Sequence, residues 1–173
     1  FETEEEWLIP AKKAPADLAT KKAIFTIQKR RIVPMLTNSE GEVSTFEGEG
    51  IDYESYLSEN QKYGYAHLDW KLVYFIFPNL PLSQQSDQIE PTGYVIPING
   101  YGLWDAVYGY LAIGADCDTV IGTTWYDQKE TPGLGANIAT PEWQKQFTNK
   151  VIFSPSSNGS THFKTAKLGI MIV

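Results

Sequence analysis

Several stretches of this chain have the hydrophobic and polar pattern of β-strands. The clearest is Trp70 to Phe77, in which branched and aromatic side chains dominate, a composition typical of a strand in the interior of a sheet. Alternating side chains from Ala23 to Leu36 predict an earlier strand. The turn residues Asn38 to Glu42 come next and predict a hairpin that continues at Val43.

Three further strands are predicted in the central part of the chain. Their segments are Tyr94 to Ile98, Val107 to Ile113 and Val120 to Tyr126. Turn residues separate them, first Asn99-Gly100 and then Asp116 to Asp118. We therefore expect these three strands to form the middle of a sheet.

Short helices are predicted at two places. Asp52 is a good N-cap for a helix through Leu57 that ends before Gly64. Thr140, followed by Pro141, is a good start for a helix that reaches Phe147. Together with the strands, these helices predict an α+β fold, a single domain with a mainly antiparallel β-sheet and a few short helices.

The remaining segments are a surface loop and two C-terminal strands. Pro78 to Pro91 is rich in polar residues and proline, which predicts a surface excursion. Val151 to Phe153 and Lys164 to Val173 have strand composition and flank a polar turn from Ser154 to Thr161.

Charge and cysteine content narrow the classes of function. The net charge of -7 and the pI near 4.8 argue against a general grip on nucleic-acid phosphates. Cys117 is the single cysteine, which excludes an internal disulfide and a cluster held by four cysteines of this chain. His67 and His162 lack metal-ligand spacing, so no metal site is predicted.

Both ends of the chain have features that we interpret as cuts. The chain begins with Phe1, and the apolar run Leu168 to Val173 is followed by no turn or polar tail. No uninterrupted apolar run approaches the roughly 20 residues that span a bilayer. We expect residues 1–20 to be a lead-in segment and residues 21–173 to be the main domain.

The most informative chemistry lies in the loop Glu130-Thr131-Pro132-Gly133-Leu134-Gly135, directly after a predicted strand. Proline fixes one backbone angle, while each glycine lets another molecule approach the main chain closely. Such a loop is suited to holding a flat ligand, although Pro-Gly by itself is also a common turn signal.

Three ordered motifs carry a family resemblance. Val-Ile-Pro-Ile-x-Gly-x-Gly-Leu-Trp precedes Leu-Ala-Ile-x-Ala-Asp, and Val-x-Gly-x-x-x-Tyr-x-Gln-x-Glu-Thr-Pro-Gly-Leu-Gly then leads to Pro-x-Trp. This order resembles the C subunit (NqrC) of the sodium-translocating NADH:quinone reductase and, more distantly, the G subunit of the Rnf electron-transport complex. The match is dense over about a third of the chain, and separated motifs in order are more specific than one glycine loop.

The resemblance implies an FMN-binding domain that relays single electrons between neighbouring subunits of a respiratory pump. It implies a position on the extracytoplasmic, periplasmic side of the bacterial inner membrane, with anchoring through an N-terminal helix missing from this chain. The other membrane subunits of the reductase would be the partners, with no nucleic acid involved. The cofactor would carry the chemistry, so no residue is assigned as a catalytic acid, base or nucleophile.

The expected flavin contacts lie in two segments. A flavin ring needs flat apolar walls and a few polar contacts. The expected contacts are Leu103, Trp104, Glu130, Thr131, Gly133 and Leu134, and the amides of Gly133 and Gly135 are expected donors. From sequence alone, Trp104 is as compatible with a core position as with a flavin contact.

In the family, FMN is joined through its phosphate to a threonine in a Ser/Thr-Gly-Ala-Thr motif that follows a strand like Lys164 to Val173. That motif is absent here, and Ser157 to Thr161 does not match it, so Thr161 is not assigned as the attachment site. We expect the main domain to stop before the motif.

Two interpretations from other classes compete with the flavin interpretation. Abundant tryptophan and tyrosine suit an extracytoplasmic glycan-binding module, and Asp105, Asp127 or Glu130 could be nominated as carboxylates of a glycoside hydrolase. The chain could also be a scaffold subunit without a cofactor of its own.

Overall fold

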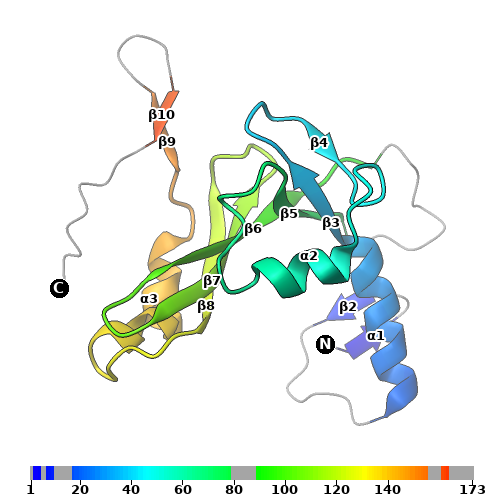
Figure 1. Cartoon of the computed structure of the whole chain (residues 1–173). Helices are drawn as coiled ribbons and strands as arrows, with labels where there is room; N and C mark the ends of the chain where they lie inside the picture. The colour runs from blue at the N-terminus through cyan, green and yellow to red at the C-terminus, as the bar shows by residue number, and fades with distance from the viewer. Residues whose placement is uncertain (1, 5–6, 10–16, 79–88, 156–160, 164–173) are drawn as a thin grey trace.

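An antiparallel β-sheet of six strands is the main element of the fold (Figure 1). The computed structural model describes residues 2–4, 7–9, 17–78, 89–155 and 161–163. The sheet order is β4-β3-β5-β6-β7-β8. Its strands are β3 (Ile32–Thr37), β4 (Val43–Ser44), β5 (Lys71–Ile76), β6 (Gly93–Tyr101), β7 (Ala106–Gly114) and β8 (Val120–Asp127).

Short helices and two small hairpins accompany the sheet. The helices are α1 (Leu18–Arg31), α2 (Tyr53–Asn60), α3 (Pro141–Gln144) and the 3₁₀ turns η2 (Gly135–Ala139) and η3 (Lys145–Phe147). The hairpins pair β1 (Glu2–Glu4) with β2 (Trp7–Ile9) and β9 (Phe153–Pro155) with β10 (Thr161–Phe163). The predicted α+β fold class is therefore confirmed.

The predicted central strands are confirmed, but one turn between them was misplaced. β5 lies between β3 and β6, as its composition predicted. The Asn99-Gly100 pair is not a turn, because Asn99 pairs with Tyr108 and Gly100 with Val107 inside the β6–β7 ladder. The turn comes at residues 102–105 instead. The strand from Val120 is also not in the middle of the sheet, since β8 is its edge.

The predicted strand from Ala23 to Leu36 is wrong over its first part, where the chain forms α1. The Asp17 side chain caps this helix, accepting a hydrogen bond of 2.7 Å from the amide of Thr20. Lys29, Arg30 and Arg31 occupy its last turn, where cations favour the helix dipole. The strand begins only at Ile32, and the predicted hairpin with Val43 is confirmed as the β3–β4 pair.

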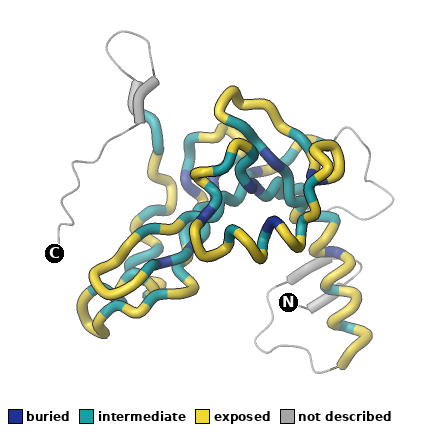
Figure 2. The backbone as a smooth tube through the Cα atoms, in the orientation of Figure 1, coloured by how far each residue is buried: buried dark blue, intermediate teal, exposed yellow. Residues whose placement is uncertain are grey.

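The core lies where α2 crosses one face of the sheet, and the buried parts of the tube concentrate there (Figure 2). Asp52 caps α2 as predicted, accepting a 2.9 Å hydrogen bond from the amide of Ser55. Leu36 and Leu72 on the sheet pack with the rings of Phe46 and Tyr56. The Phe46 and Tyr56 rings meet edge to face, with centroids 5.2 Å apart.

The segment after β8 also follows the predicted order at first. Thr140 caps α3 and Pro141 is its first residue, as predicted. Val151 forms an isolated bridge with Thr119, and the regular strand β9 begins only at Phe153. The predicted Lys164–Val173 strand and most of the predicted 78–91 excursion lie outside the described residues.

Two features are absent from the described part of the chain. None of its helices combines the length and the hydropathy that crossing a membrane requires. Within the same residues, no group of three or more His, Cys, Asp or Glu side chains is arranged to hold a metal ion.

Candidate functional site

Two loops meet at one end of the sheet. The first is the β6–β7 turn, closed by a 2.9 Å hydrogen bond from the amide of Gly102 to the carbonyl of Asp105. The second follows β8 and covers residues 128–135. Because β6, β7 and β8 are consecutive antiparallel neighbours, the β6–β7 turn and the C-terminal end of β8 lie at the same end of the sheet.

Trp104 is bonded to the second loop through its backbone and its indole. Its amide donates to Glu130 Oε1 at 3.1 Å, and its indole Nε1 donates to Thr131 Oγ1 at 3.0 Å. The structure therefore brings Trp104 together with the two polar residues that the sequence predicted for the same site. It also removes the alternative of a core tryptophan, since Trp104 is 68 % exposed.

Glycines make room for the Glu130 side chain. A Cβ at Gly102 would collide with the Glu130 carboxylate, and a Cβ at Gly135 would lie 2.8 Å from the Glu130 Cβ. At both positions the added Cβ would come closer to Glu130 than real Cβ atoms come to their neighbours. The carboxylate thus lies between the two loops because neither glycine has a side chain.

An ion pair also connects the loops, and sequence reasoning missed it. The Lys129 ammonium donates to Asp105 Oδ2, and the amide of Ala106 donates to Asp105 Oδ1 at 2.7 Å. These bonds, the one to Lys129 first, lower the pKa of the Asp105 carboxyl below its ordinary value of 3.8. The two charges are 24 positions apart in sequence, so no local pattern indicates their contact.

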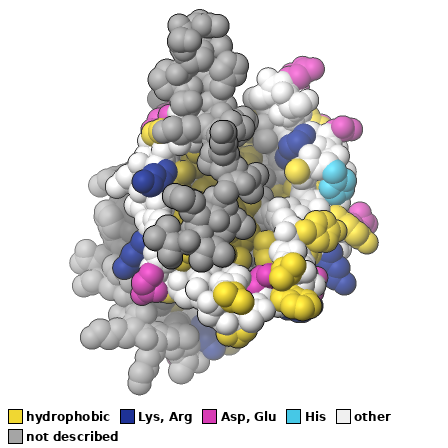
Figure 3. Space-filling view, turned by 90° about the vertical axis from the view of Figure 1, so that its left-hand side faces the viewer, with side chains coloured by type: hydrophobic (Ala, Val, Ile, Leu, Met, Phe, Trp, Pro, Cys, Tyr) yellow, Lys and Arg dark blue, Asp and Glu magenta, His cyan; other side chains and the backbone are white. Residues whose placement is uncertain are grey.

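Apolar side chains around these contacts are open to solvent. Leu103, in the first loop, is 81 % exposed, and Leu134, in the second, is 67 % exposed. Figure 3 shows the side of the molecule that carries this end of the sheet, with hydrophobic side chains grouped on its lower part next to acidic ones. Exposed apolar residues next to fixed polar groups are typical of a surface that covers a ligand or a partner.

Backbone donors in the second loop are available as well. Gly133 has a φ of +77°, a left-handed conformation that glycine adopts without steric cost. This turn is closed by hydrogen bonds from the amides of Leu134 and Ala136 to the carbonyl of Thr131, at 3.1 and 3.2 Å. The amides of Gly133 and Gly135 donate to no other described residue. Their role as donors to a flavin stays a prediction from the sequence.

These residues fit the needs of a flavin ring. Trp104 and Leu134 offer apolar surface, the glycine amides can donate to ring carbonyls, and the Thr131 hydroxyl, which accepts from Trp104, retains a proton to donate. Within the described residues, no cluster of His, Cys, Asp and Glu side chains would suit a metal ion instead.

The comparison with known proteins first gives a protein family. Residues 102–166 match the FMN-binding domain family, a range that contains both loops. The particular relatives are C subunits of the Na(+)-translocating NADH-quinone reductase. The subunit of Chlamydia caviae is 37 % identical over 165 residues, covering 91 % of this chain and 52 % of that protein. That of Chlamydia pneumoniae is 35 % identical, covering 100 % of this chain and 59 % of that protein. The predicted resemblance to the C subunit is confirmed.

A solved structure supports the fold. The crystal structure of NqrC from Shewanella oneidensis superposes with a TM-score of 0.55 at 23 % identity, covering 76 % of this chain and 62 % of that one. The chain spans little more than half the length of the two chlamydial relatives. None of these matches supports the alternative of a glycan-binding module.

Proposed function

We propose that this chain forms the flavin-holding part of an electron-carrying subunit of a Na⁺-translocating NADH:quinone reductase. FMN is the cofactor, as the match of residues 102–166 to the FMN-binding domain family supports. When bound, FMN supplies one- and two-electron redox chemistry, and the protein supplies position and polarity.

In this proposal the ring system lies against the two joined loops. Leu103, Trp104 and Leu134 provide its apolar contacts. Glu130, Thr131 and the amide of Gly133 face its polar edge. The single observation that carries the assignment is the pair of hydrogen bonds from Trp104 to Glu130 and Thr131, which fixes the indole while leaving it 68 % exposed.

The same exposure suits electron exchange. We propose that the domain works on the extracytoplasmic, periplasmic side of the bacterial inner membrane, anchored by an N-terminal helix outside this chain. Single electrons would arrive from one membrane subunit of the complex and leave to another. Leu134 and Leu103 are open to solvent, and a partner could contact the cofactor edge there without moving the sheet.

Covalent attachment completes the proposal. A phosphoester to a threonine beyond Val173 would hold the cofactor phosphate, while the two loops would hold the ring. This division predicts that the loops alone give weak, reversible binding, because ring contacts without the anchor must also offset the entropy of association.

The test uses two versions of the protein. A version extended through the C-terminal attachment motif should be yellow, and its flavin should stay with the protein in guanidinium on gel filtration. The 173-residue chain should lose FMN on the same column. A colourless, phosphate-free extended protein would refute the proposal. Covalent FMN at full occupancy on the 173-residue chain would show that the attachment residue is wrongly placed.

The ring site is tested separately on the extended protein. Trp104→Ala should leave the covalent bond intact but shift the flavin absorption bands and increase flavin emission, because the stacked indole no longer quenches it. An unchanged spectrum would place the ring elsewhere, even if the protein is yellow.

A further inference from the structure

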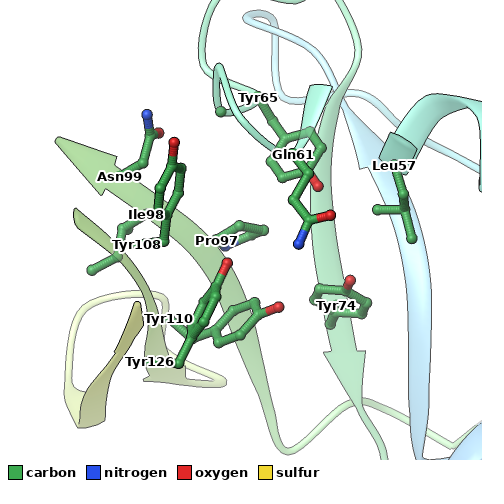
Figure 4. Close-up of a pocket in the computed structure, with 11 residues that line it drawn as sticks. Leu57, Gln61, Tyr65, Tyr74, Pro97, Ile98, Asn99, Tyr108, Tyr110 and Tyr126 are labelled. Carbon is green, nitrogen blue, oxygen red and sulfur yellow. The ribbon is translucent and has the colours of Figure 1, made fainter. Parts of the chain in front are cut away.

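A second, partly open site lies on the α2 side of the sheet, and its lining lies outside the Trp104 loops. It is a cavity of about 110 Å³ between the end of α2 and strands β5 to β8 (Figure 4). No charged side chain lines it. Its polar lining consists mainly of tyrosines together with Gln61 and Asn99.

The roof of the cavity is the segment that follows α2, and it is tied to the sheet. Gly64 has a φ of +75°, and a Cβ there would collide with the side chain of Asn99. Asn99 Nδ2 donates to the carbonyl of Tyr63 at 3.3 Å, and the Tyr108 hydroxyl donates to the carbonyl of Lys62 at 2.8 Å. The cavity is therefore held open by a fixed backbone segment.

Hydrogen-bonding groups face this space without partners. Figure 4 shows the Gln61 side chain between Tyr65 and Tyr74, with the rings of Tyr110 and Tyr126 directed toward the same space. Within the described residues, neither the Tyr65 hydroxyl nor the Gln61 side-chain amide makes a hydrogen bond. Gln61 is exposed and Tyr65 is half-buried, so both groups are accessible from the cavity and from solvent, and an acceptor on a ligand or a water molecule can pair with them.

Tyr65, Tyr74 and Tyr126 remain neutral donors at physiological pH. Burial, first among the causes, raises the pKa of Tyr126 to about 12 and raises that of Tyr65 and Tyr74 as well. A charged guest would find no opposite charge in the lining and would lose its hydration. A neutral guest with acceptor oxygens would accept hydrogen bonds from the hydroxyls and would lose little hydration free energy.

The dimensions limit the guest to a single ring. An apolar cavity of about 150 Å³ holds one benzene molecule, and this cavity is smaller, at about 110 Å³, so a ring bound here extends into the hollow next to it. The rings of Tyr110 and Tyr126 are stacked with centroids 5.2 Å apart, and they offer a flat wall. The three fused rings of a flavin are too large for this space.

The cavity has a wider polar entrance. An adjoining hollow of about 390 Å³ shares Gln61, Tyr108 and Tyr126 with it and is lined further out by Lys62, Asp105 and Lys129. A ring could enter through this hollow and leave a polar substituent there, among charges of both signs.

We propose that the tyrosine-lined cavity binds a small, neutral, single-ring molecule that carries a carbonyl or similar acceptor oxygen. The ring lies against Tyr110 and Tyr126, and the acceptor oxygen receives hydrogen bonds from the Tyr65 hydroxyl and the Gln61 amide. None of the residues that line the cavity itself belongs to the Trp104 loops, and only its entrance is shared with them, through Asp105 and Lys129.

The test is a ¹⁹F NMR titration of the full 173-residue chain with 4-fluoroacetophenone. Fluorobenzene, which lacks the acceptor, and 4-fluorobenzoate, which is charged, are the matched probes. We expect saturable binding of 4-fluoroacetophenone with a dissociation constant at least about fivefold lower than that of either comparator, the range of one hydrogen bond. Equal binding of the three probes, or no saturable binding, would overturn the proposal.

Variants locate the binding. Gln61→Trp should fill the cavity from an exposed position and abolish binding without unfolding the chain. Tyr65→Phe should weaken binding by about three- to tenfold, the effect of one lost hydrogen bond. Tyr63→Phe is the control, because this neighbouring tyrosine is 75 % exposed and does not line the cavity. Binding that survives Gln61→Trp, with a native thermal melt, would place the probe elsewhere and refute the assignment.

Discussion

The indole of Trp104 and the hydroxyl of Thr131 form a 3.0 Å hydrogen bond that joins two loops 27 positions apart in sequence. This bond fixes the orientation of the indole ring. Without it, an exposed tryptophan side chain would sample several rotamers. A preformed flat surface reduces the entropy that a planar ligand must offset on binding.

We expect Trp104→Phe and Thr131→Val each to weaken FMN binding by the unanchored chain by at least about three- to tenfold, because each removes the shared hydrogen bond as well as part of its own proposed contact with the ring. The double variant should lose less than the product of the two single losses, since the shared bond is lost only once. Fluorescence titration with FMN measures all four affinities. Trp70→Phe removes an indole that packs against the core and is the control. Fully additive losses would show that the bond is not what orders the site.

Glycine substitutions should separate two kinds of crowding at Glu130. Gly135→Ala should cost about 1–3 kcal/mol of unfolding free energy, because the new Cβ meets the Glu130 Cβ, which cannot swing away. Gly102→Ala should cost less, since it meets the end of the Glu130 side chain, which can turn aside by giving up its hydrogen bond from the Trp104 amide. Gly100→Ala is the control, because nothing lies within 4 Å of its Cβ position. Urea denaturation of the three variants gives the order, and a Gly102 cost equal to or above that of Gly135 would contradict it.

The ion pair of Asp105 with Lys129 predicts an acid-sensitive contribution to stability. The pKa of Asp105 is lowered in the folded chain, chiefly by the Lys129 hydrogen bond, from an ordinary value of 3.8. Its contribution is therefore present above about pH 4 and disappears as the pH falls through the lowered folded-state pKa. Thermal melts between pH 6 and pH 2.5 should show wild type and Asp105→Asn converging on acidification. The gap should also narrow in 0.5 M salt, because both side chains are substantially exposed. A gap that widens at low pH would contradict this sign.

Asp118 should control the local opening of the segment that contains Ile152 and Phe153. Its Oδ1 accepts from the amide of Ile152 at 2.9 Å and from that of Phe153 at 2.7 Å, which attaches this segment to the β7–β8 turn. Asp118→Ala should speed hydrogen exchange at the Phe153 amide by at least about tenfold, the effect of losing a charged acceptor. The effect at the Ile152 amide should be smaller, because that amide also donates to the Asp118 carbonyl at 3.0 Å. The control is Asp69→Ala, since the Asp69 carboxylate has no hydrogen bond within the described part of the chain. Unchanged protection at both amides would show that other contacts hold the segment.

Much of the fold could be predicted because β5 to β8 carry strand-forming side chains in the order in which they pair. The error at Ala23 to Arg31 arose because a short alternating pattern was given more weight than helix-end signals. The Asp17 cap and the terminal run of cations were present in the sequence, and they decide the conformation there. The Asn99-Gly100 error has another cause. A turn-forming pair can stay extended where a neighbouring strand offers partners on the same ladder.

The meeting of the two loops followed from motif order, but the details of the contact could not. Nothing local indicates that Glu130 would fill the space beside Gly102 and Gly135, or that Lys129 would pair with Asp105. Such contacts depend on register and on the length of the β6–β7 hairpin, which tertiary pairing sets. The tyrosine cavity was also hidden, because its walls come from five separate segments.

The meander of β6, β7 and β8 has a consequence for how the protein folds. Its strands are neighbours both along the chain and in the sheet, so pairing them requires the closure of short loops only, at a small entropic cost. Residues 93–135 can therefore assemble early, with the two loops joined by Trp104 already side by side. Destabilising changes in the distant β3–β4 hairpin should then accelerate unfolding far more than they slow the formation of this region.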